Sequence, residues 1–149
     1  MKIYYYTLFI SFLFLIIINC NGRSSKDKEE EIYTGLLEII IPYKEPLKET
    51  RIIKIWVIER GEIDRDCMGK SFDPESYPVT AYNEIEYSRE DYENKVSPKW
   101  EVELPQQTYT IVVRGYNESN QLVSIGCKWE VFVIGGGRNE VSVGLYYAK

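Results

Sequence analysis

Apolar side chains recur at every second position in one segment after another of this 149-residue chain. Trp100, Val102 and Leu104 alternate with Glu101 and Glu103, which is the period of a strand with one face buried and the other in water. Similar alternation, or a β-branched apolar run bounded by proline or glycine, marks the other expected strands: Leu36–Ile41, Ile52–Ile58, Ala81–Tyr87, Tyr109–Val113, Gln121–Ile134 and Val141–Tyr147. We predict an all-β domain of about seven strands over residues 32–149, arranged as a two-sheet antiparallel β-sandwich.

Turns and one short helix separate the expected strands. Asn117–Asn120 and Gly135–Asn139 contain the Gly and Asn residues typical of hairpin turns. Ser88 and Asp91 have the spacing of a capping box, so a short helix is expected after Ser88 with Tyr92 and Val96 on one face.

The N-terminus carries an apolar run of a different kind. Leu8–Ile18 is apolar except for Ser11, and Lys2 is the only charge before it. Even counted from Ile3, a helix over this run would rise ~24 Å, short of the ~30 Å hydrocarbon core of a membrane. A basic start, a short apolar middle and a cleavage region form the layout of a secretory signal. Residues 1–19 are therefore expected to be an export signal.

The run ends at Ile17–Cys20, with the sequence IINC, and this segment resembles the lipobox of bacterial lipoproteins. Most lipoboxes have Gly, Ala or Ser where this chain has Asn19, and looser lipoboxes of this kind are similar to those of spirochaetes. The resemblance implies that Cys20 is acylated and becomes the first mature residue. It also implies a cell-envelope protein held by lipid to a bacterial membrane, at the outer membrane or cell surface.

Two alternatives stay open for this region. Cys20–Gly22 puts small residues at both critical positions of an ordinary signal-peptidase site, and cleavage there would release a soluble product without Cys20. The run would otherwise remain as an uncleaved membrane anchor, an interpretation that its length disfavours.

The segment after the signal, residues 20–31, is expected to be a disordered tether. Asn21–Glu31 has no aromatic or aliphatic side chain with which to offset the entropy of ordering. As a flexible coil, the tether would hold the domain roughly 17–20 Å from the bilayer on average.

Charge limits the expected partners. The chain has 18 basic and 23 acidic residues, and only Lys2 leaves with the signal, so 17 basic against 23 acidic residues leave a mature charge of −6. This balance argues against nucleic acid as a partner, because nucleic-acid binding needs Lys and Arg. It also argues against electrostatic attachment to an anionic leaflet. The expected partners are the membrane, through lipid on Cys20, and an envelope or host protein or glycan.

One of the three cysteines lies at the end of the N-terminal apolar run, and the other two lie in the predicted domain. Acylation or cleavage uses Cys20, which leaves Cys67 and Cys127. In an exported chain such a pair is expected to form a disulfide, and closing this loop would contribute ~4 kcal/mol in the chain-entropy model. The alternative is that both are small buried side chains that never meet.

A second resemblance supports the fold class. Leu104–Gly115, with the sequence LPQQTYTIVVRG, resembles the LP-x-G-x-Y-x-V-x-V strand of carboxypeptidase-regulatory-like and transthyretin-like sandwiches, with Gln107 in place of the usual Gly. The resemblance implies a transthyretin-like or Ig-like sandwich. Tyr109 would then be a corner tyrosine whose hydroxyl bonds back to the backbone. Such sandwiches host many functions, so the resemblance implies no activity.

The chain has no histidine, which removes the commonest general base and metal ligand. We therefore assign no catalytic residue and no cofactor. Asp64, Asp66 and Glu75 fall at positions 1, 3 and 12 of an EF-hand-like calcium loop. Met68 occupies a ligand position and the flanks are not helical, so a solvated acidic loop is the favoured interpretation and calcium the alternative.

One aromatic residue is the candidate contact. Trp56 lies on the opposite side of its strand from Ile53, Ile55 and Val57, so it is expected to face outward. The sequence thus predicts an envelope lipoprotein that displays a non-catalytic sandwich with a binding or structural role. A carbohydrate-binding module and a carboxylate-based hydrolase are the alternatives.

Overall fold

The strands predicted from the alternation form two β-sheets in the computed structural model, which describes residues 32–59 and 67–148. A three-stranded sheet has the order β4-β1-β7 and a five-stranded sheet the order β3-β2-β5-β6-β8. The strands are β1 (Thr34–Ile40), β2 (Ile52–Glu59), β3 (Val79–Glu86), β4 (Lys99–Pro105), β5 (Thr108–Tyr116), β6 (Leu122–Phe132), β7 (Arg138–Ser142) and β8 (Tyr146–Tyr147). The all-β, two-sheet sandwich is therefore confirmed, with eight strands for the seven predicted.

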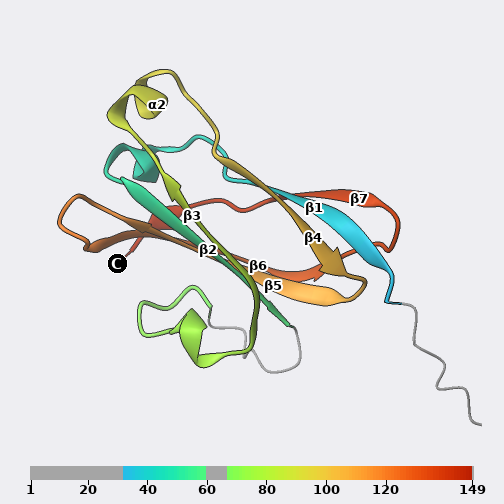
Figure 1. The fold of residues 1–149 in the computed structure, drawn as a ribbon. Coiled ribbons are helices and arrows are strands. Elements are labelled where there is room, and N and C mark those ends of the chain that lie inside the picture. The colour runs from blue at the N-terminus through green and yellow to red at the C-terminus, as the bar shows by residue number, and fades with distance from the viewer. Residues whose placement is uncertain (1–31, 60–66, 149) are drawn as a thin grey trace, which may run out of the picture. The chain divides into compact units, whose positions relative to one another are not determined.

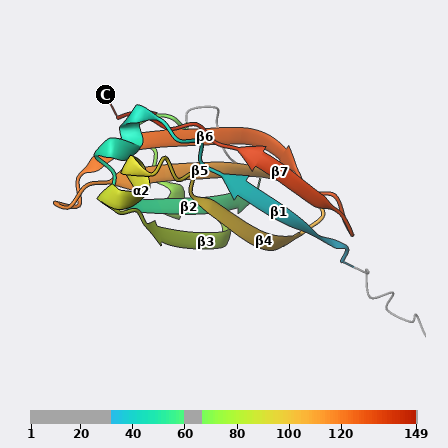
Figure 2. The same cartoon turned by 90° about the horizontal axis from the view of Figure 1, so that it is seen from above.

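The two sheets pack face to face (Figure 1), and the strands of the smaller sheet cross obliquely over those of the larger one (Figure 2). Oblique crossing follows from the twist of each sheet. The core between the sheets takes alternate residues from both, among them Leu37 and Ile39 of β1, Ile55 of β2 and Ile111 of β5, all fully buried. Hydrophobic burial of these rows holds the sheets together.

Two local predictions are confirmed by hydrogen bonds. The Tyr109 hydroxyl donates to the Pro105 carbonyl at 3.0 Å, as a corner tyrosine does. Ser88 caps the helix α2 (Arg89–Glu93) with a complete capping box: its side chain accepts from the Asp91 amide, and the Asp91 carboxylate accepts from the Ser88 amide. Since α2 ends at Glu93, Val96 lies beyond it, and the expected helical face shared by Tyr92 and Val96 does not form.

The C-terminal segment differs from the prediction of one strand. β7 pairs parallel to β1 and ends at Ser142, and residues 143–145 carry the chain across to β8 in the other sheet. Val143 stays buried because the crossing segment packs over the same core, so the alternation continues through the crossing. A Cβ at Gly126 would lie 2.7 Å from the Gly144 carbonyl oxygen, so glycine permits this close approach to β6.

Only one of the two expected hairpin turns joins neighbouring strands. Asn117–Asn120 connects β5 and β6, with the Asn120 amide donating to the Asn117 carbonyl at 2.9 Å. The prediction for Gly135–Asn139 was wrong, because this segment joins β6 of one sheet to β7 of the other. Gly136 takes a φ of +69° there, which glycine adopts without strain.

Two short 3₁₀ turns complete the described elements, η1 (Glu45–Lys48) and η3 (Pro74–Ser76). No helix within residues 32–59 or 67–148 is long and apolar enough to cross a membrane. The predicted signal, Cys20 and the predicted tether lie outside the described residues.

Candidate functional site

Trp56 is not an exposed contact, and this prediction was wrong. The side chain does leave the main core and projects from the outer face of the five-stranded sheet, but it is only 3% exposed. It packs with Ile58, Val112 and Cys67 in a second apolar cluster, against which Phe72 is partly buried. The chain after Cys67 covers this face, and nothing in the period-two pattern of β2 signals a cover from elsewhere in the chain.

The cover is fixed to the sheet at two points. Cys67 and Cys127 form the expected disulfide, with 6.0 Å between their Cα atoms. Arg114, on the outer face of β5, donates from Nη2 to the carbonyls of Gly69 (2.9 Å) and Phe72 (3.1 Å). Burial lowers the pKa of Arg114. The sequence alone led to no prediction for Arg114; the apolar Val112 on the same outward row of β5 was the signal that this face is covered.

The calcium hypothesis is not tested by the structure. Asp64 and Asp66 lie outside the described residues. Glu75 lies in η3, where its amide donates to the Asp73 carboxylate at 3.0 Å. Within residues 32–59 and 67–148, no three His, Cys, Asp or Glu side chains are grouped as metal ligands would be.

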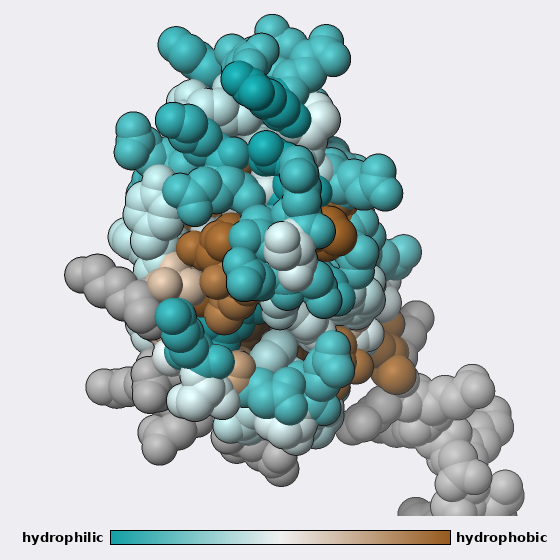
Figure 3. Space-filling view, turned by 90° about the vertical axis from the view of Figure 1, so that its left-hand side faces the viewer, coloured by the Kyte–Doolittle hydropathy of each residue, from teal (hydrophilic) through white to brown (hydrophobic). Residues whose placement is uncertain are grey.

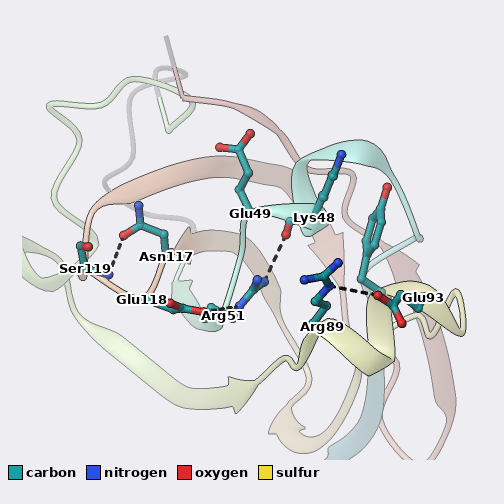
Figure 4. Close-up of a pocket in the computed structure, with 9 residues that line it drawn as sticks. Lys48, Glu49, Arg51, Arg89, Glu93, Asn117, Glu118 and Ser119 are labelled. Atoms are coloured by element: carbon teal, nitrogen blue, oxygen red, sulfur yellow. Dashed lines mark hydrogen bonds and ion pairs between the residues drawn. The ribbon is translucent and has the colours of Figure 1, made fainter.

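A pocket of about 570 Å³ opens at one end of the sandwich, between η1, α2 and the β5–β6 turn (Figure 4). None of these elements is near another in sequence, so the sequence offered no sign of it. Its lining residues are Lys48, Glu49, Arg51, Arg89, Tyr92, Glu93, Asn117, Glu118 and Ser119. Six of these nine side chains are charged, three of each sign, and the face that includes this end of the domain is mainly hydrophilic (Figure 3).

The two arginines of the pocket are held differently. Arg51 donates from Nη1 to the Thr50 carbonyl (2.8 Å) and the Lys48 carbonyl (3.1 Å), and its Nε pairs with Glu118 at 3.2 Å. Arg89 pairs only with Glu93, at 3.0 Å along one face of α2, and both side chains are largely exposed. Arg51 is therefore a fixed part of the wall, whereas Arg89 is held through Nε alone among the described residues and is 82% exposed.

Neutral hydrogen-bonding groups complete the pocket. Tyr92 packs against Tyr43 with 5.1 Å between ring centroids, and hydrogen bonding to Tyr43, together with burial, raises the pKa of Tyr92 to about 12. Tyr92 is therefore a neutral phenol at physiological pH. The Asn117 side-chain oxygen accepts from the amides of Ser119 and Gln121, which orders the β5–β6 turn at the pocket rim. Guanidinium, carboxylate, amide and hydroxyl groups are thus presented together.

A second cluster of charges lies on the outer face of the three-stranded sheet. Glu38 stands opposite Glu101 on one neighbouring strand and Glu140 on the other. Its carboxylate accepts from Arg138 (3.0 Å) and Lys99 (3.1 Å), and its side chain is 12% exposed. These two hydrogen bonds, that from Arg138 first, lower the pKa of Glu38. A carboxylate held charged in this way is unsuited to act as a general acid.

The Glu38 network predicts a defined pH dependence of stability. Because the folded-state pKa lies below the unfolded one, the stabilisation is fully present above the unfolded pKa of ~4.3 and is lost as pH falls through the folded pKa. The difference in unfolding free energy between wild type and Glu38→Gln should therefore shrink from pH 7 to pH 3, measured by urea denaturation. Glu118→Gln, which removes an exposed carboxylate, is the matched control and should give a smaller change.

Comparisons with known proteins add little. No family model matches the chain, and no curated protein matches it. Among solved structures, the chain is similar to a leucine-rich repeat protein from Bacteroides thetaiotaomicron VPI-5482, with a TM-score of 0.44 and 14% sequence identity. The match covers 76% of this chain and 12% of that one. A likeness at this level carries no argument about what this chain binds.

Proposed function

We propose that the protein is a lipid-anchored lipoprotein of the bacterial cell envelope whose β-sandwich has a non-catalytic binding role. One observation carries the anchor: two of the three cysteines are bonded to each other, which leaves Cys20 alone at the end of the apolar run. A disulfide is typical of proteins that have left the cytosol. The disulfide and the apolar run therefore both indicate that the protein is exported. The resemblance to a lipobox supplies the reason for a cysteine at position 20.

The pocket between η1, α2 and the β5–β6 turn is the proposed contact site. Its convergent polar groups beside the neutral ring of Tyr92 favour a polyhydroxylated ligand, so a carbohydrate-binding module is the second candidate function. Catalysis is less well supported. A carboxylate acts as general acid when burial raises its pKa, but Glu93 and Glu118 are exposed and each is paired with an arginine.

The anchor is tested by metabolic labelling with palmitate. Label should enter the wild-type protein and be absent from Cys20→Ala, because acylation needs that thiol. The double variant Cys67→Ser/Cys127→Ser keeps Cys20 and should label normally, which separates loss of the anchor site from general loss of cysteine. Equal labelling of wild type and Cys20→Ala, or a mature N-terminus beyond Cys20, would exclude the anchor.

The pocket is tested by binding to a panel of envelope and host-type oligosaccharides. If one binds, Arg89→Ala should weaken the affinity roughly tenfold or more, because a hydrogen bond to a charged group is worth about 1.5–3 kcal/mol. Lys128→Ala removes an exposed cation from β6, which supplies no pocket residue, and should leave affinity unchanged. Equal weakening by both variants would point to general electrostatics, and an unchanged Arg89→Ala affinity would exclude this pocket.

A further inference from the structure

Four exposed apolar side chains gather at the end of the sandwich where the chain enters it. Their exposed fractions are 73% for Ile32, 60% for Tyr33, 49% for Phe132 and 51% for Ile134. Scattered exposed apolar residues are common, but a group at one end of a domain marks an interaction surface.

Backbone contacts bring the three segments of this end together. The Gln106 amide donates to the Tyr33 carbonyl and the Gly136 amide donates to the Thr34 carbonyl, each at 2.7 Å. A Cβ on Gly135 would lie 2.7 Å from the Cβ of Tyr33. No charged residue occurs in these segments, which we call the uncharged end: Ile32–Gly35, Pro105–Thr108 and Phe132–Gly137.

The two ends of the sandwich differ sharply in chemistry. The uncharged end comprises the start of β1, the β4–β5 turn and the β6–β7 connection, at the right of Figure 1. The pocket, with six charged lining residues, lies at the other end, beside α2, η1 and the β5–β6 turn. Charged side chains line the pocket, whereas the three segments of the uncharged end carry only apolar and neutral polar side chains.

The chain enters the described domain at Ile32, which belongs to the uncharged end, so this end is where the segment from Cys20 is attached. Eleven residues lie between Cys20 and Ile32, so twelve Cα–Cα steps join them. Their fully extended reach is about 40 Å, and as a flexible coil they span roughly 17–20 Å. If Cys20 is acylated, which is the proposed function on which this inference rests, the uncharged end is the part of the domain held closest to the bilayer. Such tethering raises the effective concentration of the membrane at this surface.

We propose that the uncharged end rests in the interfacial region of the membrane that holds Cys20, with the pocket directed away from it. Tyr33 has the amphipathic ring typical of the membrane–water interface, and Ile32, Phe132 and Ile134 supply apolar area. The mature charge of −6 and the absence of Lys and Arg from the three segments of this end make the contact apolar rather than electrostatic. It therefore needs no anionic lipid.

The test uses the acylated full chain in phosphatidylcholine vesicles that contain spin-labelled lipid. A fluorophore is attached at Ile134→Cys or, as the matched control, at Ser119→Cys on the pocket rim. The introduced thiol is the only free one, because Cys20 carries lipid and Cys67 is bonded to Cys127. Quenching by the lipid should reduce emission at position 134 at least twofold and leave position 119 little changed. Adding Phe132→Ser should weaken the quenching, whereas adding Tyr82→Ser, which removes an exposed ring on β3, should not.

The outcomes separate this inference from the proposed function. Chains that float with the vesicles but are quenched equally, or not at all, at both positions would overturn the membrane contact and leave the anchor intact. The same result would favour a protein partner, in place of the membrane, for the uncharged end. Chains that fail to float would overturn the anchor and the membrane contact together.

Discussion

Trp56→Ala should lower the free energy of unfolding by about 3–5 kcal/mol, the usual cost of truncating a buried tryptophan. The ring lies between the five-stranded sheet and its covering loop and contacts the cluster of Ile58, Val112 and Cys67. Because the disulfide and Arg114 fix the loop, it cannot collapse to fill the cavity. A residue that served only as a surface contact would show a change within about 0.5 kcal/mol. Guanidinium denaturation distinguishes the two results.

Trp129→Ala is the matched control, because Trp129 lies on β6 and is exposed. It should change the unfolding free energy by no more than about 0.5 kcal/mol. A loss below about 1 kcal/mol for Trp56→Ala would mean that the loop does not cover the ring in solution. Trp56 would then again be interpreted as an outward-facing contact residue.

The outcome for Trp56 illustrates what a period-two pattern can and cannot predict. Alternation assigns each side chain to one of two faces, and it correctly separated Trp56 from Ile55 and Val57. It does not say what lies on each face. Tyr82 on the neighbouring strand β3 contacts the Trp56 ring, but Cys67 and Phe72, which also pack on it, lie outside the strands of the sheet. Burial on the outer face was therefore not predictable from β2 alone.

Local hydrogen-bonding motifs were predicted more completely than long-range connections. The Ser88 capping box and the Tyr109 corner depend on partners three or four residues away, and both are present. The crossing after Ser142 depends on which sheet the chain joins next. Since both sheets share one core, buried residues alternate through the crossing just as they would in a single strand.

The pocket could not be predicted from the sequence, because it too depends on segments that are distant along the chain. Its walls come from η1, α2 and the β5–β6 turn, and each looks like an ordinary polar surface turn in the sequence. Arg51, Arg89 and Glu118 become neighbours only because the start of β2, the helix α2 and the turn after β5 lie at the same end of the sandwich (Figure 4).

Removing the Cys67–Cys127 disulfide should lower the unfolding free energy by about 4 kcal/mol, since the bond closes a loop across 60 residues. The variant is Cys67→Ser/Cys127→Ser, which leaves no unpaired thiol in the domain. Its unfolding is compared with that of the oxidised wild type by guanidinium denaturation. Intact mass after alkylation without reductant should show two protected thiols in the wild type; free alkylation of both would exclude the disulfide.

The disulfide and Trp56 should also be coupled. The bond fixes the loop that buries the ring, so without the bond the loop can relax into the space that alanine leaves at position 56. The combined variant should therefore lose less than the sum of the two separate losses, by about 0.5–3 kcal/mol in a double-mutant cycle. As a control, Ile39→Ala in the main core does not border the loop and should add to the disulfide loss within about 0.5 kcal/mol. Strict additivity with Trp56→Ala would mean that the loop stays over the sheet without its covalent link, held by Arg114 alone.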